Sequence, residues 1–249
     1  ISIFSPGGDY LEADRLYTRS MAIQGPEVVA PFAHRINLRL VWRGPAAALR
    51  LVERAPAGQA GVEFYRVKLL LALGRREEAR ATFDAMEPAP LAETAGDIAS
   101  SDGQRLALLM ALGREELAQR RAEEVRTNAL QEFERGNRGP SVRRNFIQAE
   151  ITLGHREAAV AALEDWRRQN ERMKNSFHRL NGFPSTASFL YAALGDADAA
   201  IALLRQPEAR GLDLRYDPAF APIRSDPRFQ ELMRQQEAWM KALPDPIDP

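Results

Sequence analysis

The stretch Phe146-Ile-Gln-Ala-Glu-Ile-Thr-Leu-Gly154-His-Arg-Glu-Ala-Ala159 decides the fold. An apolar stretch with helical spacing ends at Leu153, Gly154 follows at once, and Ala159 comes five residues after the glycine. Glycine directly after the last apolar residue suits the left-handed backbone that ends a helix. A small alanine lets two helices approach closely, and Leu163 lies on the same face one turn later. The stretch therefore predicts two antiparallel helices joined by a tight turn.

The same pattern of a glycine followed five residues later by an alanine occurs five times. In the last four copies a leucine and a helix-period apolar stretch precede the glycine. An imperfect sixth copy centres on Gly44, where Ala48 comes one residue early. The alternative is that these are unrelated hairpins that share turn chemistry. A helical repeat explains the five matches better. The five pairs are Gly8 and Ala13, Gly74 and Ala79, Gly113 and Ala118, Gly154 and Ala159, and Gly195 and Ala200.

These residues resemble the tetratricopeptide repeat (TPR), whose inter-helix glycine and second-helix alanine they match. The resemblance covers nearly the whole chain, but it is degenerate. From Gly44 onward the glycines are 30, 39, 41 and 41 residues apart, whereas the family period is about 34. The resemblance implies an all-α fold, an α-solenoid of antiparallel helical hairpins. We expect a single domain over residues 1–249, with repeats at roughly 1–26, 27–58, 59–90, 97–137, 138–171 and 182–210.

The end of the chain has a different signature, in which Asp-Pro occurs at 217–218 and again at 226–227. Aspartate is favoured at the N-cap and proline at the first helical position, so both sites are predicted helix starts. We expect a cap over residues 214–242, with Arg228–Lys241 as a capping helix that has a polar outer face. This segment resembles the end of the TPR arrays in bacterial multidomain signalling regulators, which follow a winged-helix, nucleotide-cyclase or kinase domain.

The start of the chain looks incomplete for a repeat. Gly8 already stands at an inter-helix turn, so residues 1–7, with Pro6 inside them, are too short for a full partner helix. We expect the natural polypeptide to extend upstream of Ile1. Self-association through this half-repeat is the alternative way of covering its apolar residues.

Charge and hydropathy exclude several classes of function. The 249 residues include 34 basic and 34 acidic side chains, and this balance argues against nucleic acid or an anionic membrane as the partner. The longest apolar run, Leu106–Leu112, is far shorter than the ~20 residues that span a bilayer, so we expect no membrane insertion. The absence of cysteine excludes disulfides and thiolate sites. It leaves the compartment open, with the cytoplasm favoured over the periplasm.

No catalytic or metal-binding pattern is present in the sequence. The three histidines, at positions 34, 155 and 178, do not have a metal-binding helical spacing. Adjacent acids such as Glu77-Glu78 are predicted on outer helix faces, where they pair with arginine rather than act as acid and base. There is no nucleophile elbow, phosphate loop or dinucleotide fingerprint. We therefore expect no cofactor, no metal and no enzymatic activity.

In a TPR-like array the first helix of each pair lines a concave groove, and its positions can be counted back from each glycine. The polar members Lys68, Arg144 and Gln148 are the better candidates for contacts to a partner peptide. For the apolar members the alternative is a place in the core. The chaperone-binding TPRs clamp a C-terminal carboxylate with lysine and asparagine, and this chain does not reproduce that clamp. The predicted groove residues are His34, Leu38, Phe64, Lys68, Met110, Arg144, Gln148 and Phe189.

The predicted function is a non-enzymatic interaction or sensory module that binds a protein or peptide in this groove. An alternative of another class is an enzyme on an α/α scaffold, with a carboxylate site in the concavity. A third is nucleic-acid binding by an arginine-lined array, which the regular mixing of arginine and glutamate disfavours. The sequence does not name the partner.

Overall fold

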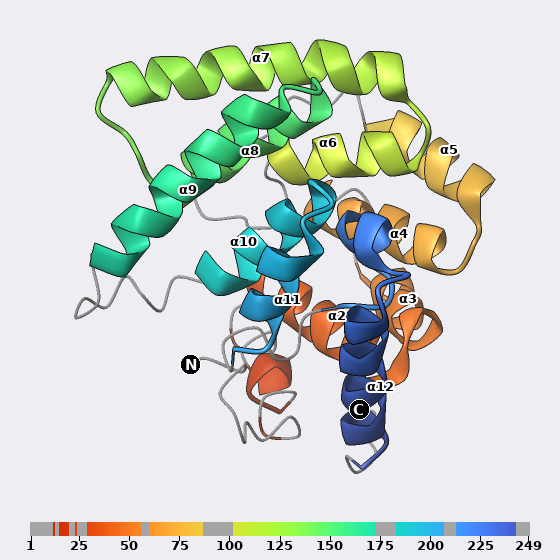
Figure 1. Cartoon of the computed structure of the whole chain (residues 1–249). Helices are drawn as coiled ribbons and strands as arrows, with labels where there is room; N and C mark the ends of the chain where they lie inside the picture. The colour runs from red at the N-terminus through yellow and green to blue at the C-terminus, as the bar shows by residue number, and fades with distance from the viewer. Residues whose placement is uncertain are drawn as a thin grey trace. The chain divides into compact units, whose positions relative to one another are not determined.

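A computed structural model describes residues 12, 15–19, 23, 29–55, 60–86, 102–172, 183–206 and 213–242. For residues 29–34 and 60–61 it describes the backbone alone. Every regular element within these ranges is a helix, and no strand occurs among them (Figure 1). The predicted all-α class is therefore confirmed for this part of the chain. The first predicted glycine and alanine pair, Gly8 and Ala13, lies outside it.

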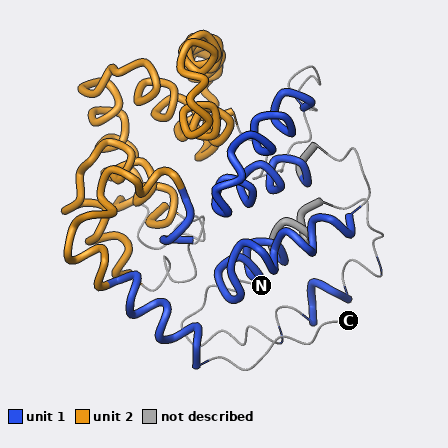
Figure 2. The backbone as a smooth tube through the Cα atoms, turned by 90° about the vertical axis from the view of Figure 1, so that its right-hand side faces the viewer, with its two compact units in different colours: residues 1–100, 211–217, 232–249 blue, residues 101–210, 218–231 orange. Residues whose placement is uncertain are grey.

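The chain forms two compact units, which Figure 2 colours separately. Unit 1 comprises residues 1–100, 211–217 and 232–249, and unit 2 comprises residues 101–210 and 218–231. Residues after 210 therefore contribute to both units. A single solenoid domain over residues 1–249 stays a prediction.

The described part of unit 1 contains two helix pairs. Helices α2 (Val29–Arg43) and α3 (Pro45–Glu53) pack against each other, and so do α4 (Ala60–Ala72) and α5 (Arg76–Met86). Both helices of the first pair also contact α4, which ties the two pairs together.

The described part of unit 2 contains three further helix pairs and residues 218–231. The pairs are α6 (Asp102–Ala111) with α7 (Glu115–Glu134), α8 (Pro140–Thr152) with α9 (Arg156–Arg172), and α10 (Phe183–Ala193) with α11 (Ala197–Leu204). The first helices contact one another, because α8 packs against both α6 and α10. The 3-10 helix η4 (Pro218–Ile223) also packs against α6 and α10. Helix α12 (Pro227–Lys241) begins in this unit and ends in unit 1.

Four of the predicted turn glycines have the left-handed backbone that the sequence pattern requires, with φ between 73° and 78° at Gly74, Gly113, Gly154 and Gly195. At Gly154 the glycine N–H donates to the Ile151 carbonyl at 3.1 Å, and the His155 N–H donates to the Glu150 carbonyl at 2.9 Å. This pair of bonds is the Schellman motif, which satisfies carbonyls left open at a helix end. The other three glycines make the same two bonds. The predicted turn chemistry is confirmed at all four.

The imperfect copy at Gly44 keeps the register of the others by a different route. Proline disfavours helical backbone at the residue before it, and Pro45 follows Gly44 directly. Gly44 accordingly has φ 79° and ψ 176°, a conformation essentially restricted to glycine, and α3 begins at the next residue. Because no residue lies between turn and helix, Ala48 is the fourth residue of α3, just as Ala79 is the fourth of α5.

The fourth-position alanines are the points at which second helices meet their neighbours. Each is 0% exposed, and its N–H donates to the carbonyl of the residue just before the helix, as Ala159 does to His155 at 3.1 Å. The residue one turn later is buried as well in every described copy. The alanines are Ala48, Ala79, Ala118, Ala159 and Ala200, and the later residues are Val52, Phe83, Ala122, Leu163 and Leu204.

The two predicted Asp-Pro helix starts are both present, but their aspartates behave differently. Proline opens η4 at 218 and α12 at 227. The Asp226 carboxylate accepts a hydrogen bond from the Arg228 N–H at 2.8 Å and pairs with the Arg228 guanidinium at 2.7 Å. The hydrogen bond from the Arg228 side chain, with the backbone bond, lowers the pKa of Asp226 to about 2. Asp217 instead binds a lysine on another helix.

Replacement of Ala159 by leucine tests the close approach. The extra volume would enter a fully buried contact on α9, so we expect Ala159→Leu to lower the free energy of unfolding by about 1–3 kcal/mol. The neighbouring Ala158 is exposed on the same helix, and Ala158→Leu should change it by less than about 0.5 kcal/mol. Urea denaturation of both variants measures the difference. Equal stabilities would show that the contact has room for a larger side chain.

The Asp226 cap predicts a pH dependence of its own. Because the folded-state pKa is lowered from 3.8 to about 2, the contribution of Asp226 is fully present above the unfolded value. It is lost as the pH falls through the folded value. We expect Asp226→Asn to flatten the dependence of unfolding free energy on pH between about pH 4 and pH 2. Urea denaturation at several pH values checks this, and parallel curves for the two proteins would contradict it.

Candidate partner-binding surface

The apolar groove residues predicted in unit 1 are buried. Leu38 on α2 lies in an apolar cluster with Trp42 and with Met240 of α12. Phe64 on α4 is 5% exposed, and its ring meets that of Tyr65 edge-on at 6.0 Å. The side chain of His34 lies outside the described residues. In unit 1, therefore, Leu38 and Phe64 are core residues.

Lys68, the predicted polar contact of unit 1, is bound within that unit. Its Nζ lies 2.7 Å from Asp217 Oδ2 and 4.0 Å from Asp213 Oδ2, and the side chains of all three residues are largely buried. Burial acts to lower the pKa of Lys68, but the two carboxylates outweigh it and raise the pKa above its usual value. Asp213 also accepts the Tyr216 N–H at 2.9 Å, which fixes the turn that carries both acids. The charge of Lys68 is thus already neutralised by the C-terminal segment, defined as residues 213–242.

Phe189 on α10, the last predicted groove residue, also contacts the C-terminal segment. Its ring centroid is 4.8 Å from that of Phe220 in η4, and Phe220 in turn packs against Phe229 at 5.3 Å. Phe220 and Phe229 are fully buried. The segment therefore contacts Leu38 and Lys68 through its unit 1 part and Phe189 through its unit 2 part. The sequence predicts this segment as a cap, and the pairing of its side chains with groove positions went unpredicted.

The remaining predicted residues, Met110, Arg144 and Gln148, lie on α6 and α8, two helices of unit 2 that contact each other. On α6, Ala107 and Met110 follow Gly103 at four and seven residues, so the three share a face. On α8, Arg144, Gln148 and Ile151 share a face for the same reason. Met110 is 43% exposed and the others, apart from Gly103, are half-buried. We define Ala107, Met110, Arg144, Gln148 and Ile151 as the α6–α8 surface.

Gly103 brings the two helices of this surface together. A Cβ atom at this position would lie 3.2 Å from both Gln148 Cβ and Asn145 Oδ1, closer than ordinary contact. The Gly103 N–H donates to Asn145 Oδ1 at 3.1 Å, so a side chain of α8 satisfies a first-turn donor of α6. The close approach fixes where Gln148 stands relative to α6.

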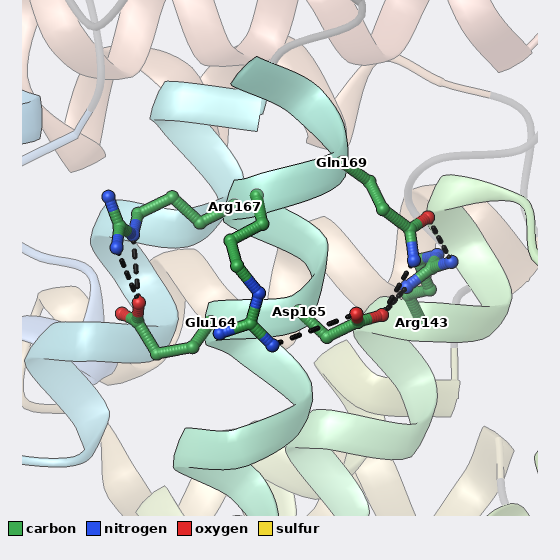
Figure 3. A network of polar contacts seen from close by, with 6 residues as sticks. Arg143, Glu164, Asp165, Arg167 and Gln169 are labelled. Carbon is green, nitrogen blue, oxygen red and sulfur yellow. Dashed lines mark hydrogen bonds and ion pairs between the residues drawn. The ribbon is translucent and has the colours of Figure 1, made fainter. Parts of the chain in front are cut away.

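Arg143, which precedes the predicted Arg144, is a fully engaged buried cation (Figure 3). Its Nε donates to the Arg138 carbonyl at 2.8 Å, and its terminal nitrogens reach Asp165 at 3.2 Å and Gln169. Gln169 also donates to Asp165 at 2.7 Å. In Figure 3 the side chains of Asp165 and Gln169, both on α9, point toward Arg143 on α8. Such charge-assisted bonds tie the two helices together.

The buried carboxylate of Glu150 forms a second link in unit 2. It accepts from Arg126 of α7 at 2.7 Å and lies 2.7 Å from Nδ1 of His155, just after the Gly154 turn. His155 is therefore an ion-pair or hydrogen-bond partner of Glu150 and lies at the joint between α8 and α9. His178 lies outside the described residues.

Arg144 differs from these neighbours. Its Nε is buried and meets no hydrogen-bond acceptor among the residues that the structure describes. Burial lowers the pKa of Arg144, and no carboxylate of the described residues acts to offset that effect. A guanidinium remains charged even so. A charge that is removed from water without a partner is unfavourable. Arg144 is therefore the charged residue of the α6–α8 surface, and its Nε has no acceptor among the described residues.

Three of the acidic residues predicted on outer helix faces are exposed and pair with arginine. Glu78 binds Arg75, Glu77 binds Arg80 and Glu124 binds Arg121, each three residues away. Asp102 on α6 differs, because burial raises its pKa while Arg105 and Arg121 act to lower it.

The described ranges lack both a metal-binding group and a membrane-spanning helix. They contain no group of three or more histidine, cysteine or acidic side chains placed to hold a metal ion. None of their helices is long and apolar enough to cross a membrane.

Comparison of the chain with protein-family models, with curated proteins and with solved structures finds no match. The support for the α6–α8 surface therefore comes from the distances, burial and charges of its own residues.

Loss of Lys68 tests the buried ion cluster. Lys68→Met would leave Asp213 and Asp217 buried without their cation, and we expect a loss of about 3–5 kcal/mol in the free energy of unfolding. Lys241 pairs with Glu237 on an exposed part of α12, and Lys241→Met should cost less than about 1 kcal/mol. Thermal and urea unfolding measure both variants. A similar small effect at both positions would show that the cluster does not stabilise unit 1.

Proposed function

We propose that the chain is a non-enzymatic interaction module that binds a segment of a partner protein on the α6–α8 surface. The observation that carries the proposal is the contrast among the predicted groove residues. Leu38, Lys68 and Phe189 contact the C-terminal segment, whereas Met110 is 43% exposed and the Nε of Arg144 has no hydrogen-bond partner among the described residues. The surface thus offers an exposed apolar side chain and a cation without a partner in the described chain.

We further propose that the helix pairs are degenerate TPR-like repeats of an α-solenoid. The support is the common register of the pairs, with a glycine of positive φ before each described second helix and a buried alanine at its fourth position. Repeat arrays of this kind stack first helices side by side and present them as a binding surface. The contacts of α8 with α6 and α10 are consistent with such stacking.

The resemblance to the arrays of bacterial signalling regulators suggests a regulatory role for the module. The contacts of the acidic side chains favour this role over an enzyme on an α/α scaffold. Glu77, Glu78 and Glu124 are held by arginines, and Glu150 is held by Arg126 and His155. A carboxylate site for acid–base catalysis commonly pairs two acids of different pKa. Burial raises the pKa of Asp102, and the charged groups that act on it are the arginines Arg105 and Arg121.

A peptide selection tests the proposal. We expect the full chain to enrich particular sequences from a random 12-residue peptide phage library, and synthetic copies to bind measurably by fluorescence anisotropy. Met110→Asp introduces a charge at the exposed apolar position of the surface, and should weaken these peptides about tenfold or more. The matched control is Val160→Asp, at an exposed apolar position on α9 outside the surface, which should leave binding unchanged.

Either of two results would overturn the proposal. One is enrichment no greater than on an unrelated protein. The other is equal binding of the selected peptides to the wild-type chain and to Met110→Asp, with circular dichroism showing that the variant is folded.

A further inference from the structure

We infer that the partner segment presents a side-chain carboxylate, from aspartate or glutamate, to Arg144. The inference rests on the proposed function, because it names the chemistry of the group that the α6–α8 surface binds. It commits to one occupant, an acidic segment of a protein, with an apolar side chain that packs near Met110 or Ile151.

The first argument is the contrast between two adjacent arginines. Arg143 has a carbonyl, a carboxylate and an amide oxygen around its guanidinium. Arg144 has an enclosed Nε with no acceptor among the described residues, and burial is what lowers its pKa. Residues one apart on a helix point about 100° apart, so Arg143 turns toward α9 while Arg144 turns to another side of α8.

The second argument is the chemistry that a guanidinium requires. It carries five N–H donors in a planar fork, accepts nothing and stays charged at physiological pH. A carboxylate matches the fork with two parallel hydrogen bonds, which is the strongest arrangement available to such a group. Other arginines of unit 2, such as Arg126 and Arg167, already hold a carboxylate of this chain. Arg144 therefore has the same need and lacks an internal group that meets it in the described chain.

The third argument is the arrangement of the surface around Arg144. Gln148 lies one turn along the same face of α8 and offers an amide that can bind the backbone of a segment. Ile151 lies seven residues from Arg144, which is about 10 Å along a helix. An extended segment covers that distance in about three residues. The surface thus fits an acidic residue followed or preceded, about three positions away, by an apolar one.

A polyanion such as RNA fits the same observations less well. Nucleic-acid sites gather several unpaired cations over one face. Near this surface Arg121 pairs with Glu124 and Arg143 pairs with Asp165, so these two cations are not available to a polyanion. The single guanidinium of Arg144 suits a single carboxylate.

A double-mutant cycle with selected peptides tests the inference. The peptides come from the phage selection on the full chain, and each is synthesised with its acidic residue and with the corresponding amide. We expect the change from acid to amide to weaken binding to the wild-type chain about tenfold or more. With Arg144→Gln the same change should have almost no effect. The control Arg120→Gln, at an exposed position of α7, should behave as the wild type does.

Stability of the free protein gives an independent readout. Because Arg144 has no partner among the described residues, Arg144→Gln should leave the urea midpoint unchanged or raise it. A clear fall in the midpoint would indicate that Arg144 holds the fold together, and would overturn the inference.

The outcomes separate the inference from the proposed function. If peptides are enriched and depend on Met110 but show no coupling between their acid and Arg144, the carboxylate inference fails and the interaction module stands. If no peptide is enriched, the proposed function itself fails. Coupling that follows amidation of the peptide C-terminus rather than of a side chain would overturn the side-chain assignment. So would a 20-nucleotide RNA that binds more tightly than the peptides through Arg144.

Discussion

The close contact between helices at a buried alanine is the constraint on which the helix pairs depend. Each described second helix places an alanine at its fourth position, and each of these alanines is wholly buried. The turn glycine serves this contact, because a Schellman turn delivers the second helix at a fixed phase. At Gly44 a different turn, set by Pro45, reaches the same phase with one residue fewer. The turn can therefore vary as long as the alanine arrives at the contact.

The C-terminal segment changes how the predicted groove should be understood. In a bare repeat array the first helices would face outward along their length, and all eight predicted residues would be equivalent candidates. In this chain Asp217 neutralises Lys68, Met240 packs in the cluster of Leu38, and Phe220 meets the ring of Phe189. The same kinds of contact that a partner would make, an acid on a cation and an apolar group on an apolar face, are made by the chain itself. The surface that we propose for a partner is the α6–α8 surface.

Local chemistry explains which parts of this structure the sequence could predict. Glycine turns, alanine contacts and the two Asp-Pro helix starts depend on residues within one turn of each other, and all were predicted where the structure describes them. The pairing of Lys68 with Asp217 joins residues 149 apart and depends on where the segment returns. Arg143 and Arg144 are identical neighbours in sequence, and only the packing of α9 against α8 distinguishes them. The amino-acid composition along the chain likewise did not indicate a division into two compact units.

The ion pairs of Lys68 with Asp213 and Asp217 have a consequence for C-terminal truncation of the protein. Two aspartates face one lysine, so the cluster as a whole is negatively charged and depends on residues close to the end of the chain. A fragment that ended before residue 213 would lack Asp213, Asp217 and Met240 of unit 1. It would also lack Phe220 and Phe229 of unit 2. Such a fragment would keep the five described helix pairs, but Lys68 would lose both of its acids and the ring of Phe189 would lose its contact with Phe220. These exposed groups would promote nonspecific association, so the proteins that bound the fragment would not indicate those that bind the intact chain.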